Sequence, residues 1–476
     1  MIEDFERCYR AAAARDARFD GWFIVAVTST HIYCRPSCPA LTPKRSNVRF
    51  FATPAAAQAA GFRACKRCRP DASPGSPEWN IREDLVARAM RLIADGVVER
   101  EGVAGLAQRL HFSQRHLHRE MLTELGAGPQ AIARAHRAQA ARTLVETTNL
   151  DFGAVAFAAG FGSIRQFNDT IRDVFASTPS ELRRKAGSQA EARNGRLTLR
   201  LARREPFDGD GLFAFLGRRT VPGIEKLDGH RYRRTLSLPH GTGTAAFNLR
   251  SDHVTCTLCL DDVRDLAAAV GRCRALLDLD ADPEAIDETL TRDRSLRQLV
   301  RATPGRRVPG SVDGFELACR AILGQQISIG GARTLAGRLA AAHGTALARP
   351  DDGLERTWPA AATLAAADLG GLGIAPRRAA TLTRVAEAVA GGDIKLDAGA
   401  DRDESESRLL AIKGVGPWTA SYIRMRALRD PDVFLDTDLG ARRAMQRIAI
   451  THNGTNADAR WRPWRSYALQ HLWTVA

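Results

Sequence analysis

The sequence lacks the features that would place it in a membrane or outside the cell. No run of about 18 apolar residues occurs among its 476 residues, so we expect no helix that spans a bilayer. The first segment, MIEDFERCYRAAAARDARF, is charged throughout and lacks the apolar stretch of a secretory signal. We therefore expect the protein to stay in a reducing cytoplasm, where clustered cysteines favour metal ligands or reactive thiols over disulfides.

Acidic side chains are missing from one long stretch. Residues 31–70 contain eight Lys or Arg and no Asp or Glu, and they hold four of the nine cysteines. The whole chain has 69 Lys or Arg against 54 Asp or Glu, a net charge of +15. Such an excess favours a polyanionic partner, first nucleic acid and second a membrane surface, although a merely basic protein remains an alternative.

Periodicity indicates both helices and strands. With 44% hydrophobic and 26% charged residues the chain is typical of globular proteins, and its length suits about three domains of roughly 150 residues. Apolar residues recur every three to four positions in 83–93 and 130–146, which predicts helices. They alternate with polar residues in 197–204 and 253–260, which predicts strands. From Ser311 to the end the pattern is helical again, interrupted by Gly-rich turns.

Two short segments are predicted linkers. Residues 72–80 and 187–195 are rich in small, polar or turn-forming residues and separate segments of different pattern. No repeat of 20–50 residues is visible, apart from two similar halves within 81–186. The fold class that follows is a multidomain chain, mainly α with α+β parts.

Four cysteines have the spacing of a zinc site. Cys34 and Cys38 form one close pair, and Cys65 and Cys68 form another after a long loop. Two such pairs fit a tetrahedral four-cysteine zinc site, because a short spacing lets one turn supply two ligands. The alternative is four unrelated buried cysteines. The remaining cysteines are expected to be structural: Cys8, Cys256, Cys259, Cys273 and Cys319.

The surrounding sequence resembles a known family. FIVAVTSTHIYCRPSCPAL and NVRFFATPAAAQAAGFRACKRCRP are similar to the N-terminal domain of the Ada family of DNA methyl acceptors. The resemblance implies that zinc-bound Cys34 accepts a methyl group from a DNA methylphosphotriester. It also implies that Thr30 and Arg63 contact DNA, with Arg45 and Lys44 as nearby basic groups. Two further DNA-contacting positions of the family fall on Pro39 and Leu41, which depart from its pattern.

The charge of such a site suggests a switch. Zn²⁺ with four thiolates is a net anion that repels phosphate, whereas a methyl phosphotriester is neutral and can approach. Methylation of Cys34 would remove one negative charge and should raise the affinity for DNA, because phosphate contacts dominate such binding.

Two helix-turn-helix patterns follow, at 103–121 and 152–175. In each, a short helix and a turn precede a longer polar-faced helix that could enter the major groove. The pattern GFGSxxxFNxxxRxxFxxTPSELR resembles the AraC-type activator domain, which implies double-stranded DNA as a partner and RNA polymerase as a candidate partner. A solvated helix face is the alternative for each residue. The candidate DNA-contacting residues are Ser113, Gln114, His116, Arg119, Ser163, Arg165, Gln166 and Asn168.

The C-terminal half contains a helix, a tight Gly-x-Gly turn and a second helix, LLAIKGVGPWTASYI. The turn at Gly414 and Gly416 suits a DNA phosphate and could hold a monovalent cation. The following VFLDTDLGARR carries Asp436 and Asp438. A carboxylate there could stabilise an oxocarbenium-like sugar and guide water to it. For one Asp taken alone, helix N-capping is an equal alternative.

Together, these segments resemble the helix-hairpin-helix DNA glycosylases of the AlkA type, from about residue 196 to 473. The resemblance implies Asp438 as the catalytic aspartate and an aromatic base pocket at Trp418, Tyr422 and Trp473. Such a wall suits cationic alkylated purines. The position that wedges into the duplex falls on Gln326 instead of an apolar residue.

The motifs also indicate which activities and cofactors the protein is expected to lack. The Schiff-base lysine of related lyases is replaced by Trp418, which implies a monofunctional glycosylase. No four-cysteine cluster follows Cys319, so no iron–sulfur cluster is expected. No Pro-Cys-His motif occurs, so O6-methylguanine transfer is not expected.

We therefore predict a bacterial, nucleoid-associated and monomeric alkylation-response protein that excises 3-methyladenine and related bases and activates transcription. Two alternatives remain: an activator whose glycosylase half only binds DNA, and a glycosylase whose front end is a structural DNA clamp. The predicted domains are 1–75 (zinc methyl acceptor), 81–187 (double helix-turn-helix), 195–305 (AlkA-like α+β subdomain) and 306–476 (helix-hairpin-helix glycosylase).

Overall fold

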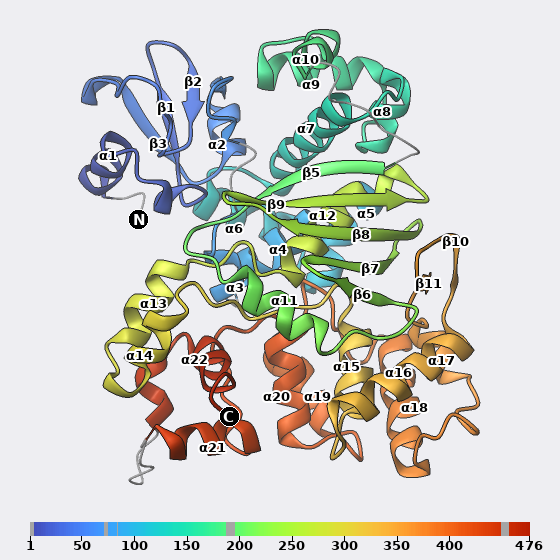
Figure 1. Ribbon diagram of the computed structural model, residues 1–476. Coiled ribbons are helices and arrows are strands. Elements are labelled where there is room, and N and C mark those ends of the chain that lie inside the picture. The colour runs from blue at the N-terminus through green and yellow to red at the C-terminus, as the bar shows by residue number, and fades with distance from the viewer. Residues whose placement is uncertain (1–3, 71–74, 83, 187–195, 449–456) are drawn as a thin grey trace. The chain divides into compact units, whose positions relative to one another are not determined.

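The computed structural model describes residues 4–70, 75–82, 84–186, 196–448 and 457–476 (Figure 1). The predicted linker 187–195 and residues 72–74 of the predicted linker 72–80 lie outside the described residues. The chain divides into two compact units. The first runs to Arg204 with Pro239–Gly241 and Thr257–Gly271, and the second comprises Glu205–Leu238, Thr242–Cys256 and Arg272–Ala476. Within the described part, no helix combines the length and apolarity needed to cross a bilayer.

The first unit begins with a small α+β domain. Helix α1 (Phe5–Ala13) precedes β1 (Ile24–Val27), β2 (Ile32–Cys34), β3 (Val48–Phe51), α2 (Pro54–Ala59) and β4 (Arg63–Ala64). The strand order is β3-β1-β2-β4, with β1 antiparallel to β2 and β3, and β2 parallel to β4. Thr53 starts α2 because its hydroxyl accepts the Ala56 N–H and Pro54 presets the first turn. Phe23, Val25 and Val48 form the small core together with the cysteines.

The helical part that follows has the predicted order. Its helices are α3 (Glu78–Ile81), α4 (Leu85–Ala94), α5 (Val97–Leu110), α6 (Gln114–Leu125), α7 (Pro129–Thr147), α8 (Phe152–Ala158), α9 (Ile164–Phe175) and α10 (Pro179–Ala186). The helices predicted at 83–93 and 130–146 are confirmed as α4 and α7. Leu106, Leu117 and Met121 lie in the core of the first helix-turn-helix pair. Phe167 and Ile171 bury the inner face of α9.

The small domain and these helices share contacts. Ala55 and Ala56 of α2 belong to the same apolar core as Leu125. The Lys66 ammonium donates to the Ala176 carbonyl at the end of α9 (2.9 Å), and Arg69 pairs with Glu146 on α7. Within the predicted linker 72–80, the described residues include the start of α3.

The α+β part after residue 196 is built on an antiparallel meander. Strands β5 (Arg196–Ala202), β6 (Glu225–Asp228), β7 (Arg231–Leu238), β8 (Gly241–Leu249) and β9 (His253–Leu260) form a sheet of order β5-β9-β8-β7-β6. The strands predicted at 197–204 and 253–260 are confirmed as β5 and β9. The register of β6 and β7 pairs Glu225 with Arg234. The helices of this part are α11 (Gly209–Gly217), α12 (Leu266–Leu276), α13 (Pro283–Thr291) and α14 (Arg294–Ala302).

A helical bundle completes the second unit. It contains α15 (Gly314–Leu323), α16 (Ile329–His343), α17 (Ala361–Ala365), α18 (Pro376–Ala390), α19 (Arg402–Leu410), α20 (Pro417–Arg426), α21 (Leu439–Arg447) and α22 (Arg465–Leu472). Helix α15 packs against α18 and α20 around Ile322, Leu382 and Ile423. The multidomain, mainly α fold class with α+β parts is confirmed.

One prediction for this region is wrong. Instead of helices alone, the segment after Ser311 also forms a hairpin of β10 (Ala346–Asp351) and β11 (Leu354–Arg356). Its turn holds Asp352 at φ +39° and Gly353 at φ +84°. An Asp-Gly pair adopts these left-handed conformations readily and favours a tight hairpin turn. This pair was the signal that the helical interpretation overlooked.

Candidate functional site

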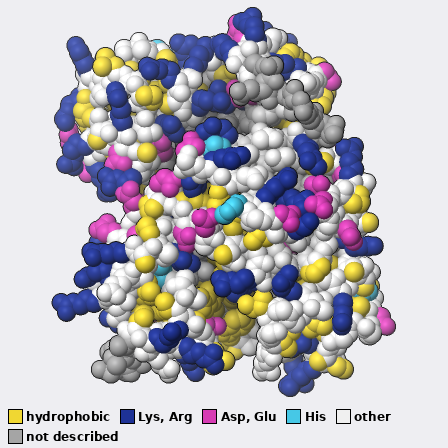
Figure 2. Space-filling model, in the orientation of Figure 1, with side chains coloured by type: hydrophobic (Ala, Val, Ile, Leu, Met, Phe, Trp, Pro, Cys, Tyr) yellow, Lys and Arg dark blue, Asp and Glu magenta, His cyan; other side chains and the backbone are white. Residues whose placement is uncertain are grey.

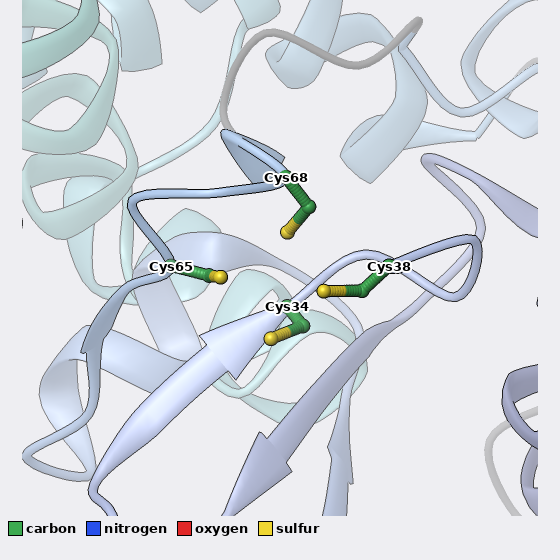
Figure 3. Close-up of side chains that lie close together, drawn as sticks. All are labelled: Cys34, Cys38, Cys65 and Cys68. Carbon is green, nitrogen blue, oxygen red and sulfur yellow. The ribbon is translucent and has the colours of Figure 1, made fainter. Parts of the chain in front are cut away.

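The four predicted zinc ligands lie together. Cys34 ends β2, Cys38 lies in the following loop, and Cys65 and Cys68 follow β4. Because β2 and β4 are parallel neighbours, with Tyr33 opposite Ala64, the two pairs emerge side by side. All four cysteines are buried, and their sulfur atoms lie within 4.8 Å of one another and point toward a common centre (Figure 3).

The donor set fits zinc. A tetrahedron with Zn–S bonds of about 2.3 Å has sulfur–sulfur distances of roughly 3.8 Å, which this cluster can accommodate. Hydrogen bonds with the other three cysteines, together with burial, raise the pKa of the Cys34 thiol, whereas hydrogen bonds with its own three neighbours, Cys34 first, lower the pKa of Cys65. The four neighbouring thiols therefore do not by themselves keep Cys34 ionised. A soft dication that replaced their protons would keep it ionised.

Sequence reasoning missed a residue that shapes this site. The buried Asp20 carboxylate accepts hydrogen bonds from the Ser37 N–H (3.0 Å) and the Ser37 hydroxyl (2.7 Å). It also pairs with Arg35 at 3.3 Å. Burial raises the pKa of Asp20 despite these partners. Asp20 thus holds the loop between Cys34 and Cys38. The available signal was one acid shortly before the acid-free stretch.

The predicted DNA-contacting groups of the small domain are at the surface. Thr30 and Arg63 are exposed, and the Arg63 N–H donates to the carbonyl of His31, the neighbour of Thr30. Arg45 pairs with Glu6 at 2.7 Å, and its guanidinium lies 4.8 Å from the Tyr9 ring. The positions that depart from the family pattern, Pro39 and Leu41, and the basic Lys44 are also exposed.

The two helices predicted to enter the major groove, α6 and α9, begin in the same way. Ser113 and Ser163 are their N-caps, and each hydroxyl accepts a main-chain N–H, from His116 and Gln166 respectively. These serines therefore start α6 and α9, in addition to any contact with DNA.

The other candidates on these helices differ in how free they are. Arg119 bonds the His116 ring at 2.9 Å. The Gln166 side chain accepts the Gly162 N–H. Arg165 is 93% exposed at its side chain, Gln114 is exposed and Asn168 is half-buried.

Asp438 is the centre of the second site. It starts α21 by accepting the Ala441 N–H at 2.8 Å. The same oxygen accepts the Trp473 indole N–H at 2.9 Å, and the other oxygen accepts the Trp418 indole N–H at 3.0 Å. Asp438 is thus an N-cap and also a carboxylate held by two aromatic side chains. Asp436 is exposed, and its main-chain carbonyl accepts from Arg442.

The aromatic residues around Asp438 are stacked. Trp418 and Tyr422, one turn apart on α20, have ring centroids 5.0 Å apart and nearly parallel planes. Trp473 stacks on Phe215 of α11 with centroids 6.2 Å apart. All three predicted pocket residues therefore belong to one cluster, and Phe215 is an addition to it.

Two arginines back this cluster, which sequence reasoning did not indicate. The Arg219 guanidinium lies 3.7 Å from the Phe215 ring centroid, and desolvation lowers the pKa of Arg219 to about 10. Arg426 donates to the Tyr422 hydroxyl at 2.7 Å. Burial raises the pKa of Tyr422, but the charges of Arg426 and Arg219 outweigh it and lower the pKa overall.

The Gly-x-Gly turn lies between α19 and α20. Gly414 has φ +105°, and a Cβ there would lie 2.1 Å from the Thr381 hydroxyl, so only glycine fits. Gly416 precedes the first residue of α20 and has open space around it. Gln326 follows α15, is exposed and has φ +54°. The main-chain carbonyls of Lys413 and Gly414 in the Gly-x-Gly turn already accept hydrogen bonds from side chains. Binding of a monovalent cation at this turn stays a prediction.

Comparison with known protein families finds matches to three parts of the chain. Three family models match: the metal binding domain of Ada at residues 7–71, a helix-turn-helix domain at 106–185, and the AlkA N-terminal domain at 198–313.

Relatives match all or part of the chain. A Mycobacterium tuberculosis protein named "Probable bifunctional transcriptional activator/DNA repair enzyme AlkA" is 54% identical and covers 100% of this chain and 97% of its own. The Escherichia coli "DNA-3-methyladenine glycosylase 2" is 33% identical over 56% of this chain and 94% of its own. A solved 3-methyladenine DNA glycosylase from Archaeoglobus fulgidus, 22% identical with a TM-score of 0.51, covers 58% of this chain and 97% of its own and shares the fold.

Proposed function

Because the chain belongs to the family of bifunctional transcriptional activators and DNA repair enzymes that join an Ada-type zinc domain and helix-turn-helix units to an AlkA-type glycosylase, we propose that its C-terminal half excises 3-methyladenine and related alkylated bases from duplex DNA. The observation that carries this proposal is the Asp438 carboxylate held between two indole N–H groups. The protein has a net charge of +15, and Lys and Arg side chains are spread over the face shown in Figure 2. Both features favour a DNA partner.

In the proposed reaction, water replaces the base at the sugar C1′ atom. The N-glycosidic bond breaks, the base leaves with its bonding electrons, and the water oxygen bonds to C1′ while its proton is lost. Asp438 stabilises the developing positive charge on the sugar and orients the water. Trp418, Tyr422 and Trp473 stack against the flipped base, Gln326 fills the space that it leaves, and the amides of Gly414 and Gly416 hold phosphate. Trp418 cannot form a Schiff base, so the product is an abasic site.

The test is base release from methylated duplex DNA. Wild type should free 3-methyladenine, and Asp438→Asn should be slower by about 10²–10³-fold, because it removes the charge that stabilises the transition state. Asp436→Asn, an exposed neighbour with the same charge change, should resemble wild type. If wild type binds DNA but releases no base, the C-terminal half is a binding module. If Asp436→Asn is the slow variant, the chemistry belongs to that carboxylate.

For the N-terminal domain we propose stoichiometric methyl acceptance. The Cys34 sulfur attacks the methyl carbon of a methylphosphotriester, a C–S bond forms, and the C–O bond breaks as the phosphodiester leaves. Zinc held by the four cysteines would keep Cys34 a thiolate at neutral pH. Methylation then lowers the negative charge of the site and strengthens promoter binding by the helix-turn-helix units.

Radiolabel transfer from methylated DNA tests this second proposal. Label should appear on wild type and on Cys259→Ser, and should be absent from Cys34→Ser. If wild type remains unlabelled, the N-terminal domain accepts no methyl group, and the alternative of a structural DNA clamp is favoured. Methylated protein that binds no promoter more tightly than unmethylated protein would remove the switch. RNA polymerase as a partner, a monomeric state, a bacterial nucleoid location and the lack of an iron–sulfur cluster stay predictions.

A further inference from the structure

The residue before Gln326 is hydrogen-bonded to three other segments of the second unit. Gln325 follows α15 and is half-buried. Its side-chain amide nitrogen donates to the Gly414 carbonyl at 3.0 Å and to the Thr419 hydroxyl oxygen at 3.0 Å. Its main-chain carbonyl accepts from the Arg378 guanidinium at 2.6 Å. Gln325 is therefore fixed at both its side chain and its backbone.

The two partners of the amide belong to different parts of the site. Gly414 lies in the turn proposed to hold phosphate. Thr419 is buried at 3% exposure and adjoins Trp418 on α20. A single amide group thus joins the loop that carries Gln326 to the Gly-x-Gly turn and to the first turn of α20, although Gln325 lies 89 residues before Gly414 and 94 residues before Thr419 in the chain.

The Gly-x-Gly turn, to which Gln325 donates, is itself held by contacts with α18. The Lys413 carbonyl accepts from the Thr381 hydroxyl at 3.2 Å and from Arg384 at 3.3 Å. Gly414 itself packs against Thr381 too closely for any side chain. Position 414 therefore cannot move far without breaking contacts to α18, and it provides a fixed reference for Gln325.

The backbone of Gln326, which follows Gln325, has a conformation that neighbouring contacts must enforce. Gln326 is exposed and holds φ +54°, in the left-handed region that non-glycine residues rarely adopt. Such a conformation persists only where neighbouring contacts enforce it. The contacts of Gln325 immediately before it supply that constraint.

We propose that Gln325 is a positioning residue that presents Gln326 to the duplex and couples its insertion to phosphate binding at Gly414. This inference rests on the proposed glycosylase function. Gln325 need not touch the reacting atoms; it acts through Gln326 and through the placement of α20. Its ligand class is a DNA duplex from which one nucleotide has been displaced.

The direct test is Gln325→Glu, which keeps the size of the side chain but turns its donor into an acceptor that faces the Gly414 carbonyl. 2-Aminopurine beside an abasic-site analogue reports insertion, because its fluorescence rises when it unstacks. We expect the affinity for this DNA to fall by about tenfold or more and the fluorescence rise to be lost. Gln325→Ala, which removes the amide without adding charge, should show the same pattern in a milder form.

Excision rates separate positioning from general damage. Single-turnover excision should fall at least tenfold on a fully paired duplex. It should fall much less where the alkylated base lies in a mismatch that already unpairs it. A merely structural loss would lower both rates equally.

Two comparison variants complete the experiment. Gln298→Glu, an exposed residue on α14 with the same charge change, should match wild type. Gln326→Ala should reproduce the Gln325→Glu pattern, and the double variant should be no worse than Gln326→Ala alone, because both act on one step.

The outcomes distinguish this inference from the proposed function. If wild type releases base and Gln325→Glu behaves like Gln298→Glu, the positioning role is overturned and the glycosylase proposal stands. If wild type releases no base, the glycosylase proposal fails. The fluorescence assay on abasic DNA, which needs no catalysis, still decides whether Gln325 controls insertion: an unchanged signal in Gln325→Glu overturns the inference.

Discussion

At the scale of single residues, N-capping by Asp438 is compatible with the catalytic role proposed for its carboxylate. Its side chain caps α21 and is also held by two indoles. The capping bond fixes the carboxylate relative to the helix, and the indole bonds fix it relative to the aromatic cluster. A carboxylate fixed in this way needs little reorganisation when positive charge develops nearby.

Trp473→Phe should slow base excision while keeping the ring stack. The change removes the N–H bond to one Asp438 oxygen and retains an aromatic face against Phe215. A hydrogen bond to a charged group contributes about 1.5–3 kcal/mol, so the single-turnover rate should fall roughly 10- to 100-fold. Trp464→Phe is the matched control and should keep the wild-type rate. Equal rates for the two variants would show that the indole bond is not used in the reaction.

His471 on α22 should make stability depend on pH. Burial, with a smaller effect of the Arg306 charge, lowers the pKa of His471 to about 3. An unfolded histidine has a pKa near 6.5, so below this pH the unfolded state binds the extra proton and stability falls. At pH 5 the loss should be about 2 kcal/mol relative to neutral pH. Burial raises the pKa of Asp278 to about 6, and this acts in the opposite direction.

Urea unfolding of wild type and His471→Leu between pH 7 and 5 isolates this effect, because Asp278 contributes equally to both. The variant should lose less stability over that range. His230→Leu, at an exposed position, should keep the wild-type dependence. Parallel curves for wild type and His471→Leu would assign the acid sensitivity to other groups.

At the scale of elements, the parallel pairing of β2 with β4 builds the metal site. Each cysteine pair is local, but the two pairs meet only because residues 32–33 lie opposite 63–64. The same β4 loop reaches α9 and α7 through Lys66 and Arg69. The metal site is thus continuous with the helix-turn-helix part.

Cys38→Ser should remove bound zinc and unfold the small domain. Structural zinc contributes on the order of 10 kcal/mol to such domains, which have little apolar core of their own. Wild type should hold one zinc per chain by elemental analysis, and amide exchange in β2 and β4 should rise in Cys38→Ser and after chelation. Cys259→Ser, at a half-buried cysteine on β9 outside the cluster, should retain zinc. Zinc retained by Cys38→Ser would contradict the four-ligand site.

At the scale of the whole molecule, the two chemistries should be separable. The four cysteines lie within the first unit, and Asp438 with its aromatic residues lies within the second. We expect Asp438→Asn to accept methyl groups as wild type does. We expect Cys34→Ser to release bases within about twofold of the wild-type rate, because neither substitution touches the other site. Both assays on each variant check this, and a loss of both activities in either variant would show that the sites depend on each other.

The sequence by itself determined much of the chemistry. The spacing of Cys34, Cys38, Cys65 and Cys68, the helical and strand periodicities and the Gly-x-Gly turn are local properties, readable without long-range contacts. They predicted the fold class, the helix-turn-helix order and the four cysteines that lie together. Local reading failed at 346–356, where an Asp-Gly turn outweighed a presumed helical pattern.

Only the tertiary structure decided which side chains act together. It separated Asp438, held by two indoles, from the exposed Asp436, and it revealed Asp20 beneath the cysteine loop and Arg426 behind Tyr422. It also showed that Gln325 reaches Gly414, a residue 89 positions away. Such contacts depend on how helices and strands from distant segments pack, and no local pattern encodes that packing, which is why these residues could not be chosen from the sequence.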